Sequence, residues 1–284
     1  MSHRIRILTS TALFALAALP AFAADYDSPL YERLVYDEAA EVPVEVGTGW
    51  YLRGDIGYAF STRPAGTFSY RTFDPGTQTY GNANFATQAL KGDLNFGVGF
   101  GYRFNDWMRA DLTAERFQMR FNGTTTDAAP CTGQPVDTTC RTEDAASLNG
   151  TALMANAYVD LGTFAGFTPY IGGGAGFTIA GWNALNSTQH CVPGAGACGA
   201  PLPALESSAG ISSWRFTYAA MAGVAYDVSD NLKIDLGYKY RKVAGGDMFG
   251  FRQSESNNGA TGPKGRDPGF GQHEIRVGLR YALW

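Results

Sequence analysis

The chain has 284 residues, a net charge of −4 at neutral pH and 13% aromatic residues. Its length fits one domain or two small ones, and its acidic balance argues against nucleic acid as a partner. Its 36 glycines and many aromatic residues fit twisted strands with aromatic belts, and they fit a helical enzyme poorly.

The N-terminus has the pattern of a secretory signal peptide. Arg4 and Arg6 precede an apolar run over about 7–19, and Ala-Phe-Ala at 21–23 has the small-x-small form of a cleavage site. An uncleaved transmembrane helix is the alternative, but the run is shorter than the ~20 residues needed to span a bilayer. Removal of residues 1–23 takes away two arginines and no acids, which brings the net charge to −6.

Residues 24–49 are acidic, with Arg33 as the single basic residue among them. We interpret this stretch as a periplasmic leader that keeps the exported chain soluble before insertion. A plug or a partner-binding arm is the alternative. The domain boundaries that follow are 1–23 for the signal peptide, 24–49 for the leader and 50–284 for the remaining domain.

Eight segments of that domain alternate apolar and polar side chains with period two. Successive side chains of a strand point to opposite faces, so each segment has one apolar face and one face of charges and glycines. A soluble barrel would place the apolar face inside, whereas aromatic-rich apolar faces suit a barrel that faces lipid. The expected strands cover about 50–60, 90–104, 107–121, 148–161, 168–182, 214–228, 232–243 and 273–283.

These strands predict an all-β fold: an eight-stranded antiparallel transmembrane up-and-down β-barrel, with an N-terminal signal peptide, in which the first strand pairs with the last. Long polar connections alternate with short turns along the chain. In outer-membrane barrels the short turns are periplasmic and the long loops extracellular. We therefore expect the cell outer membrane as the location, with extracellular loops and both termini in the periplasm.

The third expected strand changes phase near Arg116. Before this residue the outward set is apolar, whereas after it Phe117, Met119 and Phe121 form the apolar set. A β-bulge would explain the change, and so would a strand that leaves the bilayer and continues as a pleated extension. The sequence leaves both explanations open.

Aromatic residues fall where the two interfacial belts of such a barrel would lie. At the turn end these are Trp50, Phe104, Trp107, Tyr226, Tyr281 and Trp284, and at the loop end Phe60, Trp182, Trp214 and Tyr240.

The four cysteines form two close pairs, Cys131 with Cys140 and Cys191 with Cys198, each inside one long connection. An exported chain passes through an oxidising periplasm, so two local disulfides are the first interpretation. Cross-pairing of the two connections is the alternative. A zinc site is less favoured because only His190 lies nearby, so we predict no metal and no cofactor.

The run Pro-Tyr-Ile-Gly-Gly-Gly-Ala-Gly-Phe at 169–177 is rich in glycine. We interpret its alternate glycines as a flat inner wall that a neighbouring side chain can approach. A nucleotide-binding loop is the alternative, but no helix follows to supply an N-terminal dipole.

Several strand sequences resemble the small alphaproteobacterial outer-membrane β-barrel (porin-like) family, of the eight-stranded OmpA-membrane-domain type. They are WYLRGDIGY from Trp50, ANAYVDLG from Ala155, TPYIGGGAG from Thr168, AGVAYDVSDNLKIDLGYKYR from Ala222 and HEIRVGLRYALW from His273. The resemblance covers nearly the whole chain apart from leader and loops. It implies an abundant envelope protein, and some members are described as porins or surface antigens. One departure is that Trp284 is out of phase with the outward set of its strand.

The inward faces carry a nearly balanced set of charges, and buried charges must be paired or hydrated. Because eight strands leave little room, we expect a salt-bridged plug, with a narrow hydrated pore as the alternative. The predicted lumen charge network consists of Arg53, Asp55, Asp93, Arg103, Arg109, Asp111, Asp160, Asp227, Lys233, Asp235, Arg276 and Arg280.

The expected function is that of an outer-membrane β-barrel, a structural envelope component with at most a narrow porin-like pore. A surface adhesin or antigen acting through the loops is the alternative, and a lipid-modifying enzyme, or a protease, is a further one. The mature chain has only His190 and His273 as histidines, with no serine placed to suggest a nucleophile and base, so we predict no catalytic residues. The expected partners are outer-membrane lipid, lipopolysaccharide and the barrel-assembly machinery during insertion.

Overall fold

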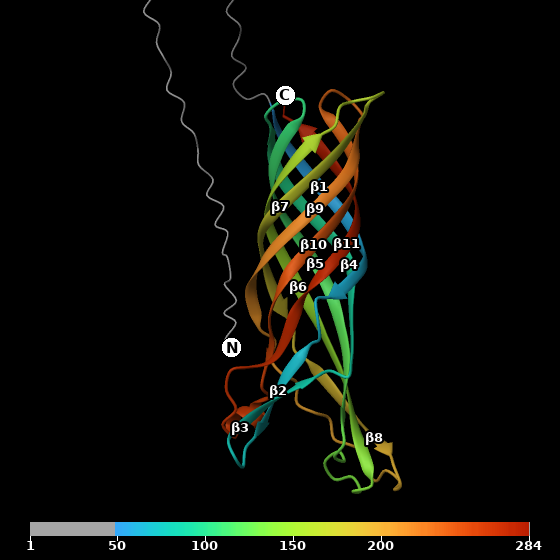
Figure 1. Ribbon diagram of the computed structural model, residues 1–284, viewed down its shortest axis with the longest axis vertical. Helices are drawn as coiled ribbons and strands as arrows, with labels where there is room; N and C mark the ends of the chain where they lie inside the picture. Colours follow the sequence, from blue (N-terminus) through green and yellow to red (C-terminus); the bar gives the residue numbers. More distant parts are fainter. Residues whose placement is uncertain (1–48, 284) are drawn as a thin grey trace, which may run out of the picture. The chain divides into compact units, whose positions relative to one another are not determined.

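The computed structural model describes residues 49–283, and eight antiparallel strands form its barrel (Figure 1). The predicted signal peptide, nearly all of the acidic leader and Trp284 lie outside the described residues. The first and last strands pair with each other, which closes the ring as predicted. The ring strands are β1 Trp50–Pro64, β4 Thr87–Arg103, β5 Met108–Asp127, β6 Thr138–Asp160, β7 Phe167–Trp182, β9 Ser212–Asp227, β10 Leu232–Gly250 and β11 Pro263–Ala282.

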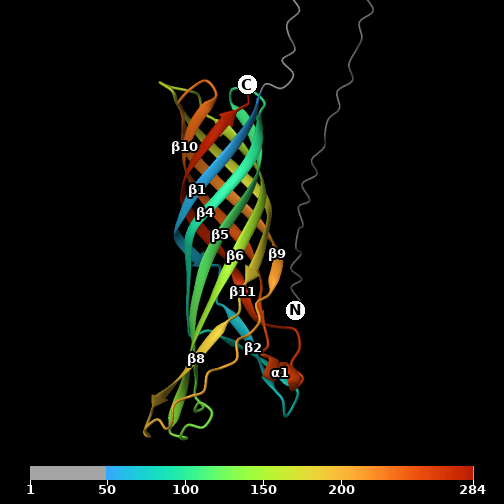
Figure 2. The ribbon, with the colours of Figure 1, turned by 180° about the vertical axis from the view of Figure 1, so that it is seen from behind.

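The long connections contain regular structure that the sequence pattern did not predict. Strands β2 Ser69–Asp74 and β3 Thr79–Asn84 form a hairpin, β8 Asn186–Pro193 pairs with β6, and α1 spans Gln253–Asn257. Together with the far ends of β5, β6, β10 and β11 they form what we call the distal extension. Figures 1 and 2 show two arms in it, one around β2, β3 and α1 and the other around β8.

The barrel wall faces outward with its apolar side, as the alternation predicted. Leu52 and Ile56 are 51% and 55% exposed, whereas Arg53 between them is buried. The same contrast recurs on every ring strand, because a period of two keeps alternate side chains on one face. The described residues contain no helix long and apolar enough to cross a membrane.

The phase change near Arg116 is an exit from the apolar medium and not a bulge in β5. The register between β5 and β6 is continuous from Met108 to Asp127. Phe117 and Met119 therefore lie on the same inward side as Glu115. What changes is the chemistry of each side: beyond Arg116 the interior becomes apolar and the exterior polar, as in a water-soluble sheet.

A real irregularity lies in the neighbouring strand. The pairing of β4 with β5 shifts between Gly92 and Asn95, so the residues on either side of the shift differ in facing. Asp93, which we predicted in the lumen, lies on the outer surface and forms an ion pair with the exposed Arg120 at 2.7 Å. That prediction was wrong because strict alternation was carried across the bulge.

Candidate functional site

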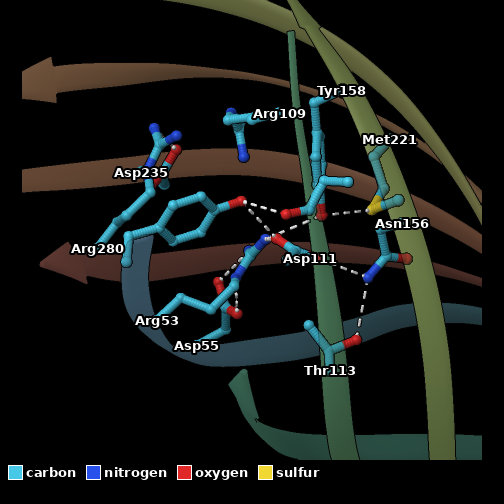
Figure 3. Close-up of polar contacts among 12 residues, drawn as sticks. Arg53, Asp55, Arg109, Asp111, Thr113, Asn156, Tyr158, Met221, Asp235 and Arg280 are labelled. Carbon is cyan, nitrogen blue, oxygen red and sulfur yellow. Dashed lines mark hydrogen bonds and ion pairs between the residues drawn. The ribbon is translucent and has the colours of Figure 1, made fainter. Parts of the chain in front are cut away.

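The turn-side half of the lumen is filled by a hydrogen-bonded ion cluster (Figure 3). Arg53 donates from Nε and Nη2 to the two carboxylate oxygens of Asp55, at 2.9 and 2.8 Å. Its Nη1 donates to Asp111 at 2.6 Å and to the Tyr158 hydroxyl at 2.8 Å. The Tyr51 hydroxyl donates to Asp111 at 3.2 Å. Strands β1, β5 and β6 are thus joined across the interior.

A second cluster lies beside the first. Arg109 donates from Nε to Asp160 at 3.1 Å, and its guanidinium lies 4.0 Å from the ring centroid of Tyr158 and 4.7 Å from that of Tyr170. A Cβ at Gly172 would lie 2.5 Å from the Tyr158 ring, so this glycine makes room for the tyrosine. The glycine run of β7 therefore serves packing.

The middle of the lumen holds a buried network that the predicted residue set did not include. Lys239 pairs with Glu115, and Arg241 donates to Glu115 at 3.0 Å, to Gln272 at 2.9 Å and to Glu274 at 3.1 Å. All of these side chains are buried. The alternation of the sequence places these side chains on the inward faces of their strands. It does not show which of them pair, because the partners lie on strands distant in the chain.

The remaining predicted lumen residues divide into two groups. Arg280 pairs with Asp235 at 3.2 Å inside the barrel, and Arg276 is buried with its Nη2 3.4 Å from the Met221 sulfur. Arg103 lies exposed at the turn end, where Asp227 and Lys233 also pair with each other while partly exposed. These last three line the mouth and not the lumen.

An apolar cap closes the interior beyond the charged layers. Its members come from the ring strands other than β1 and from the long connections; they include Phe68, Phe85, Leu90, Phe117, Met119, Phe121, Leu148, Trp182, Met248, Phe249 and Phe270. One buried ion pair, Arg215 with Asp267 at 2.6 Å, lies at its edge.

Trp182 belongs to this cap and not to the aromatic belt in which we placed it. It is buried, and its indole Nε1 donates to Asp267 at 3.2 Å. The prediction was wrong because Trp182 shares the inward face of β7 with Thr178 and Ala180, at a level where the interior is apolar. Trp284 lies outside the described residues, and Tyr240 is half-buried. The other belt residues are exposed on the outer surface: Trp50, Phe60, Phe104, Trp107, Trp214, Tyr226 and Tyr281.

The two disulfides join Cys131 to Cys140 and Cys191 to Cys198, the local pairings expected from the sequence. Both lie in the distal extension. Cys140 and Cys191 are register partners on β6 and β8, so the two bridges flank one strand pair. They hold the tip of one arm, where Cys140 is the last register position of the β5–β6 pairing.

A cavity of about 160 Å³ lies within the extension. The buried side chains of Phe85, Leu185 and Phe249 line this cavity, and all three belong to the apolar cap. Its walls carry two acids, Asp127 and Asp144, and two bases, Arg252 and Lys264.

The charged walls of this cavity are incompletely paired. Ser187 donates to Asp144 at 2.5 Å, and burial raises the pKa of that carboxyl. Burial lowers the pKa of Lys264, which donates to Glu255 at 2.6 Å. The buried Nε of Arg252 has no hydrogen-bond partner among the described residues. The cavity therefore offers a cation and a carboxylate to a small polar solute.

The two histidines among the described residues lie apart on the outer surface. The Nδ1 atom of His273 and the Tyr238 hydroxyl share a hydrogen bond of 2.6 Å. The Nε2 atom of His190 lies 3.7 Å from a carboxylate oxygen of Glu143. Within residues 49–283 no three His, Cys, Asp or Glu side chains are grouped to hold a metal ion.

Comparison with known proteins places the chain among bacterial outer-membrane proteins. The sequence profile of the family described as "Outer membrane protein beta-barrel domain" matches residues 9–282. An uncharacterized protein of Brucella suis biovar 1 is 37% identical over 255 residues, covering 84% of this chain and 87% of the relative. Outer membrane protein PagN of Salmonella typhimurium is 29% identical over 156 residues, covering 53% of this chain and 57% of the relative.

Among solved structures, the outer membrane protein OprG from Pseudomonas aeruginosa aligns with a TM-score of 0.46 at 16% identity, covering 84% of this chain and 96% of that one. The family profile matches nearly the whole chain, and the Brucella relative is 37% identical to this chain over 84% of its length. The chain belongs to the outer-membrane β-barrel domain family.

Proposed function

We propose that this outer-membrane barrel is a structural envelope component whose lumen is closed to solutes. The observation that carries the proposal is the stacking of charged clusters and apolar cap along the interior, with Arg109, Arg241 and Phe121 at most 1% exposed. A solute would have to break several buried ion pairs and then displace packed aromatic rings. Each buried charge that loses its partner costs several kcal/mol.

We also propose that the distal extension is extracellular and that both ends of the barrel sequence lie at the periplasmic face. Tyr51 and Ala282 are register partners, so the first and last strands share the turn end. Short turns at the periplasm and long connections outside are the rule in bacterial barrels. Protease or membrane-impermeant labelling of intact cells should reach the extension, and labelling only after the outer membrane is opened would reverse the assignment.

The closed lumen is tested by conductance of the purified protein in planar bilayers. We expect no steady current steps from the native chain, because side chains fill the lumen at each successive level from the turn end to the apolar cap. Any small current should respond to Arg109→Ala or Asp111→Ala in the lumen and not to substitutions around Cys191 in the extension. A large, steady and unselective conductance would refute the closed lumen.

We further propose that the protein is not an enzyme. Nucleophilic catalysis needs a nucleophile and a base in contact. His273 instead pairs with Tyr238 on the outer surface, and His190 lies beside Glu143. Lipid A and reporter peptides should be unchanged by the purified protein, and a new lipid A species in its presence would contradict the proposal.

A second candidate function is the binding of a surface ligand by the extension, as an adhesin or antigen would bind. The cavity with the unpartnered Arg252 Nε and the buried Asp144 favours this candidate. Binding of host-matrix components by isolated protein should fall in Arg252→Met and Asp144→Asn, and not in Arg141→Met, whose side chain is half exposed on the opposite face of β6 from Asp144.

A further inference from the structure

A basic patch lies on the outer surface where the ring strands leave the apolar band. We define it by Lys91 on β4 and by Arg116 and Arg120 on β5, all of which are exposed. Lys91 is the register partner of Arg120, so the two side chains are neighbours. Arg120 is 74% exposed in its side chain, and Asp93 is its ion-pair partner, which leaves the patch with an excess of two positive charges.

The position of the patch relative to the bilayer follows from the inversion of polarity along β5. Leu112 faces outward as an exposed apolar side chain, and Arg116 is the first charged one on that face. Its register partner Phe96 is still exposed and apolar, whereas Phe117 is already turned into the cap. The patch therefore sits at the boundary between hydrocarbon and headgroups.

An apolar groove of about 680 Å³ lies on the outer wall across β4, β5, β6 and β7. Small side chains, Ala114, Ala155 and Ala175, line it together with Leu112 and Leu153. Ala114 lies on the outward face of β5 two residues before Arg116, and Thr151, which accepts a hydrogen bond from Arg116 at 2.8 Å, lies two residues from Leu153. The groove thus ends at the basic patch.

We propose that the groove and the basic patch together bind one molecule of phosphorylated lipopolysaccharide, with an acyl chain in the groove and the lipid A phosphates on the patch. Charge complementarity fixes the headgroup end, since Lys and Arg bind phosphate through charge-assisted hydrogen bonds. The groove would favour one acyl chain through the fit of its shape. Lipid tails are as apolar as the barrel wall, so the hydrophobic effect contributes little free energy to this contact. Along β5, Arg116 and Arg120 stand about 14 Å apart, so the patch extends over more than one phosphate group.

The proposal rests on the extracellular orientation of the extension, since lipopolysaccharide occupies the outer leaflet. A binding assay in detergent micelles tests lipopolysaccharide binding separately from the orientation of the barrel, because a micelle has no inner and outer leaflet. The full mature chain is refolded in micelles and titrated with lipopolysaccharide that carries phosphorylated lipid A. We expect one bound molecule per chain and weaker binding at high salt.

Two sets of variants test the two halves of the site. Lys91→Gln, Arg116→Gln and Arg120→Gln combined should weaken binding about tenfold. Arg103→Gln, an exposed charge at the opposite end of β4, should leave it unchanged. Ala155→Phe should weaken binding by filling the groove, whereas Ala222→Phe on the lipid face of β9 should not.

Experiments with other lipids distinguish specific binding of lipopolysaccharide from binding to any anionic lipid. Lipopolysaccharide with its lipid A phosphates removed should bind the native chain as weakly as the intact lipid binds the triple variant. Phosphatidylglycerol should not compete. Unchanged binding in the triple variant or in Ala155→Phe, or displacement by phosphatidylglycerol, would overturn the proposal. A failure of the cell-labelling test with the binding pattern intact would instead overturn the orientation alone.

Discussion

At the scale of single residues, Arg241 is the clearest test of the lumen. It is fully buried and joins Glu115, Gln272 and Glu274, so its removal leaves Glu274 without a cationic partner, whereas Glu115 keeps Lys239. We expect Arg241→Met to lower the free energy of unfolding by about 3–5 kcal/mol, because breaking a buried pair strands an uncompensated charge. Equilibrium urea unfolding in phosphatidylcholine vesicles measures the effect.

The matched control is Arg141→Met. Arg141 pairs with Glu143 at 3.2 Å, but both side chains are about half exposed. Removal of such a surface pair costs about 1 kcal/mol or less. Equal losses in the two variants would mean that water reaches the middle of the lumen and hydrates the carboxylate of Glu274.

At the scale of elements, β5 crosses from one medium into another, and two outward residues report the crossing. Leu112 lies in the lipid-facing band, whereas Gln118 lies beyond Arg116, where the exterior is polar. We expect Leu112→Arg to destabilise the inserted barrel by about 2–4 kcal/mol, the cost of a charge on the lipid face near mid-bilayer. Gln118→Arg should change the stability by less than about 0.5 kcal/mol.

Refolding and urea unfolding in lipid vesicles compare these two variants directly. Both residues lie on the outward face of β5 and both variants introduce the same side chain, so each variant serves as the control of the other. A comparable loss in Gln118→Arg would place the bilayer boundary further along β5 than the inversion of polarity indicates.

At the scale of the whole molecule, the ring and the extension are held by different means. The ring closes through strand pairing and buried charges, whereas both disulfides lie in the extension. We therefore expect the double variant Cys131→Ser/Cys140→Ser to keep the barrel folded, with its heat-modifiable gel mobility unchanged. The β5–β6 tip should become more sensitive to protease, because the cross-link that restricts its opened states is lost.

The double variant Cys191→Ser/Cys198→Ser provides the complementary measurement. It should also keep the gel mobility of the folded barrel, because β8 pairs with β6 in the extension and not in the ring. Loss of heat-modifiable mobility on removal of either bridge would show that the extension contributes to closing the ring.

The period-two alternation was enough to predict eight ring strands, their outward faces and the short turns. It succeeds because lipid on one side and a polar lumen on the other impose opposite demands on successive residues such as Leu52 and Arg53. The close spacing of the cysteines was likewise enough to expect local bridges. These features depend on residues that are near in sequence.

What the tertiary structure decided depends on residues that are distant in sequence or on a change of medium. The bulge in β4 moved Asp93 to the outside, and no local pattern marks it. Trp182 lies on the inward face of β7 by alternation, and an aromatic ring is stable there because β7 has left the lipid, a boundary that belongs to the assembled ring. The partners of Glu115 come from β10, over a hundred residues away in sequence. Alternation tells which side a charge faces, whereas only the closed ring brings the opposite charge across to meet it.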